Sequence, residues 1–115
     1  MPTPQSELIE RLRVLLTGEP STREVSMFGG RSFMVNEKMV VSALKEGALL
    51  VRVPPDEHDE LTTHPGAEQA EMGVGRSMGP GWVSVSASAI DTDERLSFWL
   101  TVALDYNRTT ATSHR

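Results

Sequence analysis

Residues 25–53 read VSMFGGRSFMVNEKMVVSALKEGALLVRV, and this stretch decides the fold class. It contains successive runs rich in Val, Leu, Met and Phe, separated only by short polar turns at residues 36–38 and 45–47. Turns of this length leave no room for crossover helices, so the runs predict an antiparallel meander. The glycine pair at residues 29–30 interrupts the first run and predicts a bulge or bend within one strand.

Helical patterns lie on both sides of this meander. Before it, apolar residues recur at helical spacing between residues 8 and 16, and Thr3 followed by Pro4 is a favourable helix start. After it, residues 91–108 carry a wide apolar face, and either Asp91 or Thr92 can cap this last helix. We therefore expect helices to cover a sheet.

The remaining segments complete the predicted order of elements. A short helix is expected near residues 56–63, a short strand near residues 68–72, and an alternating strand at residues 82–87. The order α-β-β-β-α-β-β-α predicts an α+β domain of two layers, in which helices cover a five-stranded antiparallel sheet. We expect residues 1–108 to form this single domain and residues 109–115 to be a flexible polar tail.

The composition limits the classes of function. The chain has 115 residues, no cysteine and a net charge of −5, from 11 basic and 16 acidic side chains. Without cysteine there is no disulfide or thiolate chemistry. No stretch approaches the ~20 apolar residues of a membrane span, and the N-terminus does not resemble a signal peptide, so we expect a cytoplasmic protein. The acidic balance favours protein or small-molecule partners over nucleic acid, which needs a basic surface.

Motifs of catalysis and cofactor binding do not match this chain. The Gly-rich segment at residues 73–81 starts like a dinucleotide fingerprint, but Met78 stands at the third glycine position and a strand pattern follows. No serine lies in a Gly-x-Ser-x-Gly elbow. His58 has acidic neighbours, but side chains on a short helix point in different directions rather than converging on a metal ion. We predict no catalytic, cofactor-binding or metal-binding residues.

The acidic segment at residues 56–71 is a candidate partner surface. It contains six acidic residues and no lysine or arginine. We expect it to form a docking face for a basic partner. Four of its carboxylates are candidate contact residues: Asp56, Glu57, Asp59 and Glu60.

Two arginines beside glycines form a second candidate site. Arg31 follows the glycine pair Gly29 and Gly30, and Arg76 lies in the Gly-rich segment. If the two loops are neighbours in the fold, the arginines can hold an anion together.

The chain also resembles a known family, the TfoX/Sxy family, in its N-terminal domain. The resemblance rests on Met27-Phe28-Gly29-Gly30 with the strands that follow, on Glu71-Met72 with Met78-Gly79-Pro80-Gly81-Trp82-Val83, and on the Leu-Phe-Trp residues of the last helix. It covers residues 5–108 and implies an α+β domain similar to the chaperones of type III secretion. Relatives regulate natural competence together with the cyclic-AMP receptor protein, and they carry a second, helical domain that has no counterpart in this sequence. The resemblance implies no catalytic residues.

These observations lead to two hypotheses of function. The first is a non-enzymatic regulatory or adaptor domain that binds a protein partner, acts in transcriptional or competence-type regulation, and forms a homodimer through a sheet edge or the last helix. The second is a small-molecule or anion-binding domain, or an enzyme, that uses the Gly-rich loops with Arg31 and Arg76. Direct binding to nucleic acid is not expected.

Overall fold

The computed structural model describes residues 3–19, 22–27, 30–36, 38–73 and 76–112, and within them an α+β architecture. The α-helices are α1 (Pro4–Leu15), α2 (His58–Leu61) and α3 (Asp93–Thr112). The 3-10 helices are η1 (Lys45–Gly47), η2 (Pro55–Glu57) and η3 (Ala87–Ile90). The strands are β1 (Thr22–Met27), β2 (Gly30–Val35), β3 (Lys38–Ala43), β4 (Leu49–Arg52), β5 (Ala67–Gln69), β6 (Glu71–Gly73), β7 (Arg76–Ser77) and β8 (Trp82–Val85).

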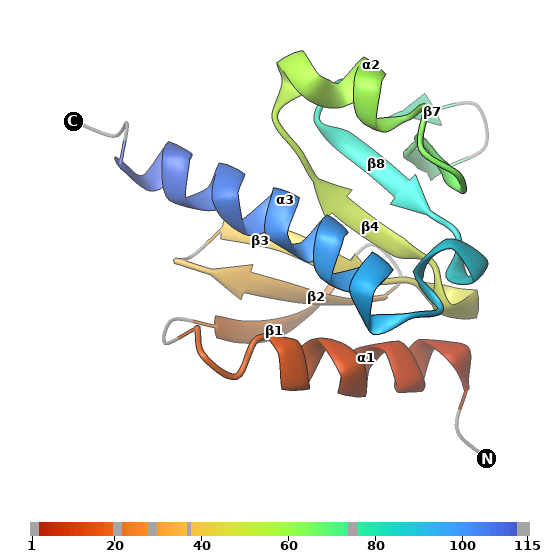
Figure 1. Ribbon diagram of the computed structural model, residues 1–115, viewed down its shortest axis with the longest axis vertical. Helices are drawn as coiled ribbons and strands as arrows, with labels where there is room; N and C mark the ends of the chain where they lie inside the picture. The colour runs from red at the N-terminus through yellow and green to blue at the C-terminus, as the bar shows by residue number, and fades with distance from the viewer. Residues whose placement is uncertain (1–2, 20–21, 28–29, 37, 74–75, 113–115) are drawn as a thin grey trace.

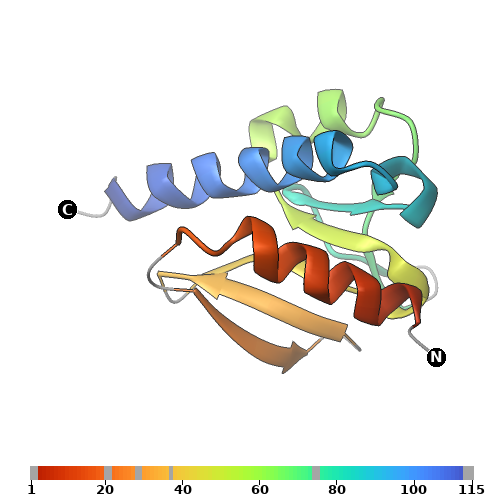
Figure 2. The same ribbon diagram turned by 60° about the horizontal axis from the view of Figure 1, so that its bottom comes forward.

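The main sheet is antiparallel throughout, with the strand order β1-β2-β3-β4-β8-β5. Strands β6 and β7 pair separately. Both long helices, α1 and α3, pack against β3, so they cover the same face of the sheet (Figures 1 and 2). The predicted α+β fold with an antiparallel sheet covered by helices is confirmed.

The first strand pattern was interpreted wrongly as one bulged strand. The two parts of this run instead form a hairpin, in which β1 and β2 pair from Thr22 opposite Val35 to Met27 opposite Gly30. The two halves satisfy each other's backbone hydrogen bonds at the small entropic cost of a short loop. The sheet therefore has six strands rather than five.

Smaller differences concern the second half of the chain. The single strand expected near residues 68–72 is divided into β5 and β6, and β6 pairs with β7 of the Gly-rich segment, a pairing that the sequence did not predict. The strand expected at residues 82–87 ends at Val85, and Ala87 already belongs to η3. Helix α3 continues to Thr112, into the segment expected to be a tail.

The predicted helix caps are present. The Thr3 hydroxyl accepts a hydrogen bond from the Ser6 amide at 3.0 Å, and the Ser6 hydroxyl accepts one from the Thr3 amide at 2.9 Å. Of the two candidates for α3, Thr92 is the cap, because its hydroxyl accepts the Arg95 amide at 3.2 Å. These bonds satisfy N–H groups that have no partner within a helix.

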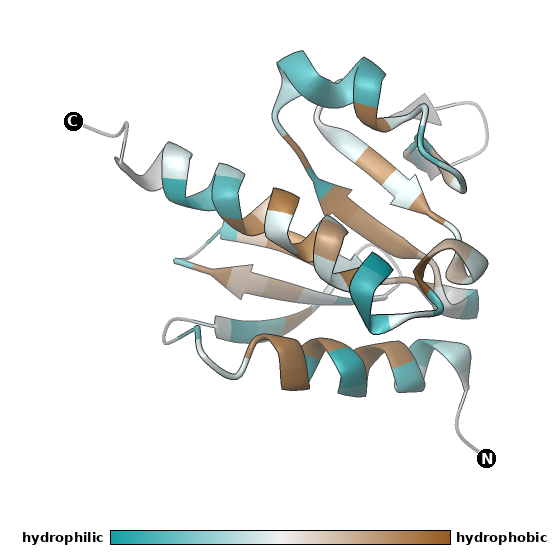
Figure 3. Cartoon of the chain, in the orientation of Figure 1, coloured by the Kyte–Doolittle hydropathy of each residue, from teal (hydrophilic) through white to brown (hydrophobic). Residues whose placement is uncertain are grey.

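One hydrophobic core lies between the helices and the sheet. It is built from α1, the central strands and α3, and its largest fully buried side chains include Leu12, Phe33, Leu49, Ile90 and Leu96. Figure 3 shows that β4 is hydrophobic, whereas most of α2 is hydrophilic. The exposed polar surface of α2 is therefore not needed to close the core.

Gly30 provides the first test of this architecture. A Cβ atom at Gly30 would collide with the backbone carbonyl of Ala43 on β3, which cannot move aside as a flexible side chain can. We expect Gly30→Ala to lower the free energy of unfolding by about 1–3 kcal/mol, as overpacking does. Gly18→Ala is the matched control, because nothing lies within 4 Å of its added Cβ. Urea unfolding of both variants measures the difference, and equal stabilities would contradict the close approach of β2 and β3.

Candidate functional site

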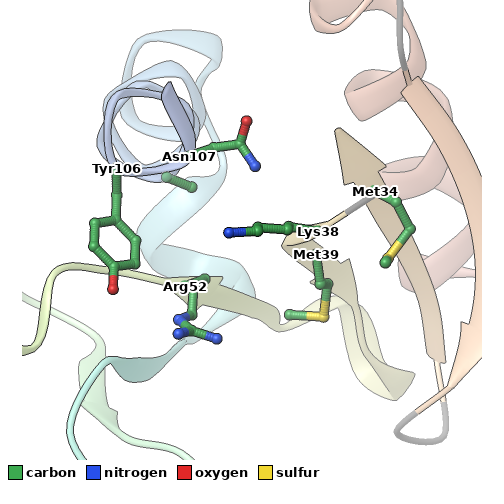
Figure 4. A pocket seen from close by; sticks show the side chains of 7 residues that line it. Met34, Lys38, Met39, Arg52, Tyr106 and Asn107 are labelled. Carbon is green, nitrogen blue, oxygen red and sulfur yellow. The ribbon is translucent and has the colours of Figure 1, made fainter. Parts of the chain in front are cut away.

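A cavity of about 350 Å³ lies between α3 and the strands β2, β3 and β4 (Figure 4). We call it the cationic pocket, because the lining that the structure describes contains two basic side chains and no carboxylate. The lining residues are Met34, Lys38, Met39, Arg52, Ala103, Tyr106 and Asn107. The figure shows Lys38 reaching into this space from β3, with the Arg52 guanidinium below it and the Tyr106 ring to one side.

Two aromatic rings hold Arg52 in place. The register of the sheet puts Arg52 directly opposite Trp82. The guanidinium carbon lies 4.7 Å from the centroid of the Trp82 ring and 5.6 Å from that of Tyr106. Both distances fit cation–π contacts. The Nε atom is buried and has no hydrogen-bond partner among the described residues, an exception to the rule that buried polar atoms are paired.

Asn107 fixes the position of α3 above the pocket. Its side chain is only 4% exposed. The Nδ2 atom donates a hydrogen bond to the Val35 carbonyl at 3.0 Å, and the Oδ1 atom accepts one from Asn36 at 3.3 Å. These bonds attach the helix to the end of β2. Because Tyr106 is adjacent to Asn107 on α3, the same bonds fix the position of Tyr106.

A second cleft, of about 380 Å³, opens on the other side of Tyr106. We call it the acidic cleft. It is lined by Pro54, Asp56, Glu57, Val102, Asp105, Tyr106 and Thr109. Three of these side chains are carboxylates, and the lining described in the structure includes no lysine or arginine. Asp105 also forms an ion pair with Arg108 at 3.2 Å.

The structure thus brings two of the four predicted acidic residues into one cleft. Asp56 and Glu57 belong to η2, while Asp59 and Glu60 follow on α2 and are exposed outside the cleft. Asp105 joins them from α3, far along the sequence. No sequence pattern linked Asp105 to the acidic segment.

The histidines have structural contacts. His58 is buried, and its Nδ1 atom accepts a hydrogen bond from the Gly81 amide at 3.0 Å. His64 stacks on Phe98, with ring centroids 5.1 Å apart, beside a hollow of about 220 Å³ that Trp99 also lines. Among the residues that the structure describes, no cluster of histidine and carboxylate side chains can hold a metal ion.

Arg31 lies in an ion network with Glu24 and Arg13. Its guanidinium donates a hydrogen bond to the Glu24 carboxylate at 3.2 Å. Arg13 of α1 donates two hydrogen bonds to the same carboxylate, at 2.8 and 2.9 Å, in a bidentate arrangement. The hydrogen bond from Arg13 lowers the pKa of Glu24 below its usual value, although partial burial opposes this shift. The network joins α1 to β1 and β2.

The other members of the arginine and glycine candidate site are placed only in part. Gly30 lies in β2, whereas Gly29 and the side chain of Arg76 lie outside the described residues. The backbone of Arg76 belongs to β7, in the small sheet that follows β5. Three strands separate β2 from β5, which is roughly 19 Å along the sheet at the usual strand spacing.

Comparison with known families identifies the chain. The family model described as the TfoX N-terminal domain matches residues 15–106, most of the sequence. The chain belongs to this family. No curated protein matches its sequence.

The match of the TfoX N-terminal domain covers both clefts almost completely. It runs from the end of α1 through all the strands to Tyr106, which separates the two clefts. Asn107 and Thr109 lie just beyond it. Within the described part of this domain, no helix has the length and apolar character to cross a membrane.

Sequence reasoning missed the residues of the cationic pocket. Arg52 is the basic residue that interrupts the apolar run LLVRV, and Asn107 is a polar residue that extends the buried face of the last helix. A polar residue at an otherwise apolar position is a signal of a special role. No sequence pattern indicates that Lys38 lies near Arg52, because their proximity depends on how β3 and β4 lie beside each other.

The ion network of the TfoX N-terminal domain predicts a dependence on pH. A carboxyl group with a lower pKa in the folded state stabilises the fold above its unfolded pKa, and this stability is lost as the pH falls through the folded pKa. We expect Glu24→Gln to be less stable than the parent at about pH 7, with the difference narrowing below about pH 5.

Urea unfolding across this pH range measures the effect. Glu10→Gln is the control, because Glu10 contacts the same Arg13 but is largely exposed, and we expect a smaller change. If the loss of stability in Glu24→Gln does not depend on pH, the charge of Glu24 does not stabilise the fold, which would contradict the prediction.

Asn107 provides a second test of the site. Asn107→Leu leaves the buried Val35 carbonyl without its donor, so we expect a loss of about 1–3 kcal/mol in the free energy of unfolding. Asn36→Gly removes only the 3.3 Å bond, and glycine tolerates the positive φ of 54° at that position. Unfolding curves for the two variants should therefore differ clearly; similar curves would show that the Val35 bond contributes little.

Proposed function

We propose that this protein is a cytoplasmic, non-enzymatic regulatory domain that acts by binding a basic segment of a protein partner. Membership of the TfoX N-terminal domain family supports a regulatory domain of the competence type. The observation that carries the proposal is the acidic cleft, in which Asp56, Glu57 and Asp105 gather without a basic side chain in the described lining. Such a cleft attracts cationic groups.

The surroundings of the cleft extend the acidic surface. Asp59 and Glu60 are exposed on α2, directly after η2. Carboxylates on two adjacent elements can contact successive lysine or arginine side chains of one segment. Their field also accelerates the encounter with a basic partner, and this effect weakens as salt is added.

The contacts of the histidines support a non-enzymatic role. A general base needs a free nitrogen close to a nucleophile. In the described residues, the Nδ1 atom of His58 accepts a hydrogen bond from the Gly81 amide, and His64 stacks on Phe98 and meets the Trp99 ring edge-on. Among the described residues, neither histidine forms a hydrogen bond with a serine, and both pack against neighbouring groups.

Self-association is part of the proposal and stays a prediction. The main sheet ends at β1 and β5. Strand edges of this kind can pair with a second copy of the chain. The use of the Gly-rich loops with Arg31 and Arg76 as a ligand site also stays a prediction.

The acidic cleft is tested by a matched pair of double variants. Asp56→Asn with Glu57→Gln removes two adjacent charges in the cleft, while Asp93→Asn with Glu94→Gln removes two adjacent charges at the opposite end of α3. Proteins captured from cell extract by the parent are identified, and the basic segment of the captured partner is titrated against all three proteins. We expect the cleft variant to bind about tenfold more weakly and the control to change by less than about twofold.

The affinity of the parent protein for the basic segment should also fall as salt is added. Equal binding by both double variants, or a partner that binds without a basic segment, would contradict the proposal.

A further inference from the structure

The cationic pocket contains two positive charges, those of Lys38 and Arg52. Among the described residues, neither Lys38 nor Arg52 forms an ion pair, although both line the same cavity. Other arginines of the described residues, such as Arg13 and Arg31, do contact a carboxylate. Like charges facing one space repel each other, and an anion between them removes the repulsion.

Arg52 is prearranged for such an anion. The contacts with Trp82 and Tyr106 hold its guanidinium in one position, so little side-chain freedom is lost when a ligand binds. Its Nε atom is buried and lacks an acceptor. A guanidinium offers a planar set of N–H donors that matches the oxygens of a carboxylate or phosphate group.

The other walls of the pocket are apolar or aromatic. Met34 and Met39 line one side, and Ala103 and Tyr106 line the side of α3. Methionine side chains adapt to the shape of a ligand, and an aromatic wall favours a flat group. The volume of about 350 Å³ is near the lower end of the range for small-molecule sites. It suits one ring with a charged group.

The neighbouring acidic cleft limits the charge of the ligand. Asp56, Glu57 and Asp105 lie on the other side of Tyr106. Their field disfavours a polyanion that extends past the ring, so the negative charge has to lie at Lys38 and Arg52.

We propose that the cationic pocket binds a small molecule with one aromatic or similarly flat apolar group and one carboxylate or phosphate group. The oxygens of the anionic group contact Arg52 and Lys38, and the ring packs against Tyr106 and the two methionines. This site goes beyond the proposed protein recognition and does not depend on it, because the acidic cleft and the cationic pocket have opposite charges.

The binding is tested by NMR titration of the full chain with four probes. Benzoate and phenyl phosphate carry both required groups, benzyl alcohol carries only the ring, and inorganic phosphate carries only the charge. We expect saturable shifts of backbone amide signals around Lys38, Arg52 and Tyr106 with one or both aromatic anions. Benzyl alcohol and inorganic phosphate should bind at least about tenfold more weakly.

Comparison of benzoate with phenyl phosphate decides which anionic group the pocket prefers. Absence of saturable shifts around the pocket with both aromatic anions would overturn the proposal. Equal binding of benzyl alcohol would overturn it as well, because the charges would then have no role.

Variants separate the pocket from general electrostatic attraction. Lys38→Met and Arg52→Met should each weaken binding of the better aromatic anion about tenfold or more. Arg11→Met removes the same charge on α1, where Arg11 pairs with Asp93, and should leave the affinity within about twofold.

Lys38 is exposed, so its variant is expected to fold. Arg52→Lys keeps the positive charge but lacks the planar set of N–H donors, and it replaces Arg52→Met in the test if Arg52→Met is unstable. We expect Arg52→Lys to bind the aromatic anion more weakly than the parent does. Unchanged affinity in Lys38→Met and in the Arg52 variant would overturn the assignment of the site.

Discussion

Packing of α3 across the central strands is the interaction on which the rest of the structure depends. Its buried face, with Leu96, Trp99, Leu100 and Ala103, covers the sheet at β3 and β4, and α1 packs beside it on the same face to complete the core. A sheet of this kind is stable only when its apolar face is covered. The same packing brings the end of α3 over the strand ends, where both clefts form.

The two clefts differ in charge although they share a wall. Tyr106 lines both of them, with Lys38 and Arg52 on one side and Asp56, Glu57 and Asp105 on the other. The contact of Arg52 with the Tyr106 ring replaces the ion pair that an arginine usually forms at a surface. The charges therefore stay apart, and each cleft keeps an electrostatic character of its own. This separation is what allows one small domain to offer different sites to a basic segment and to an anion.

Arg31, which the sequence suggested as part of an anion site, has a structural role in the folded chain. Arg31 and Arg13 share the carboxylate of Glu24, and this network fastens the first helix to the first hairpin. Arg31 follows glycines because Gly30 has to pass close to the Ala43 carbonyl. A glycine beside an arginine is thus explained here by backbone packing, which a sequence pattern cannot distinguish from a ligand site.

Local patterns in the sequence determined the elements of this protein. Alternating apolar residues predicted most strands, helical spacing predicted α1 and α3, and threonine caps marked where these helices begin, because each of these signals acts over a few residues. The family resemblance and the acidic segment were also visible in the sequence. Tertiary structure alone decided that the first run forms a hairpin, that Asp105 joins Asp56, and that Lys38 and Arg52 line one pocket. Those groupings depend on strand register and on how α3 crosses the sheet, which are set by packing between residues far apart in the chain.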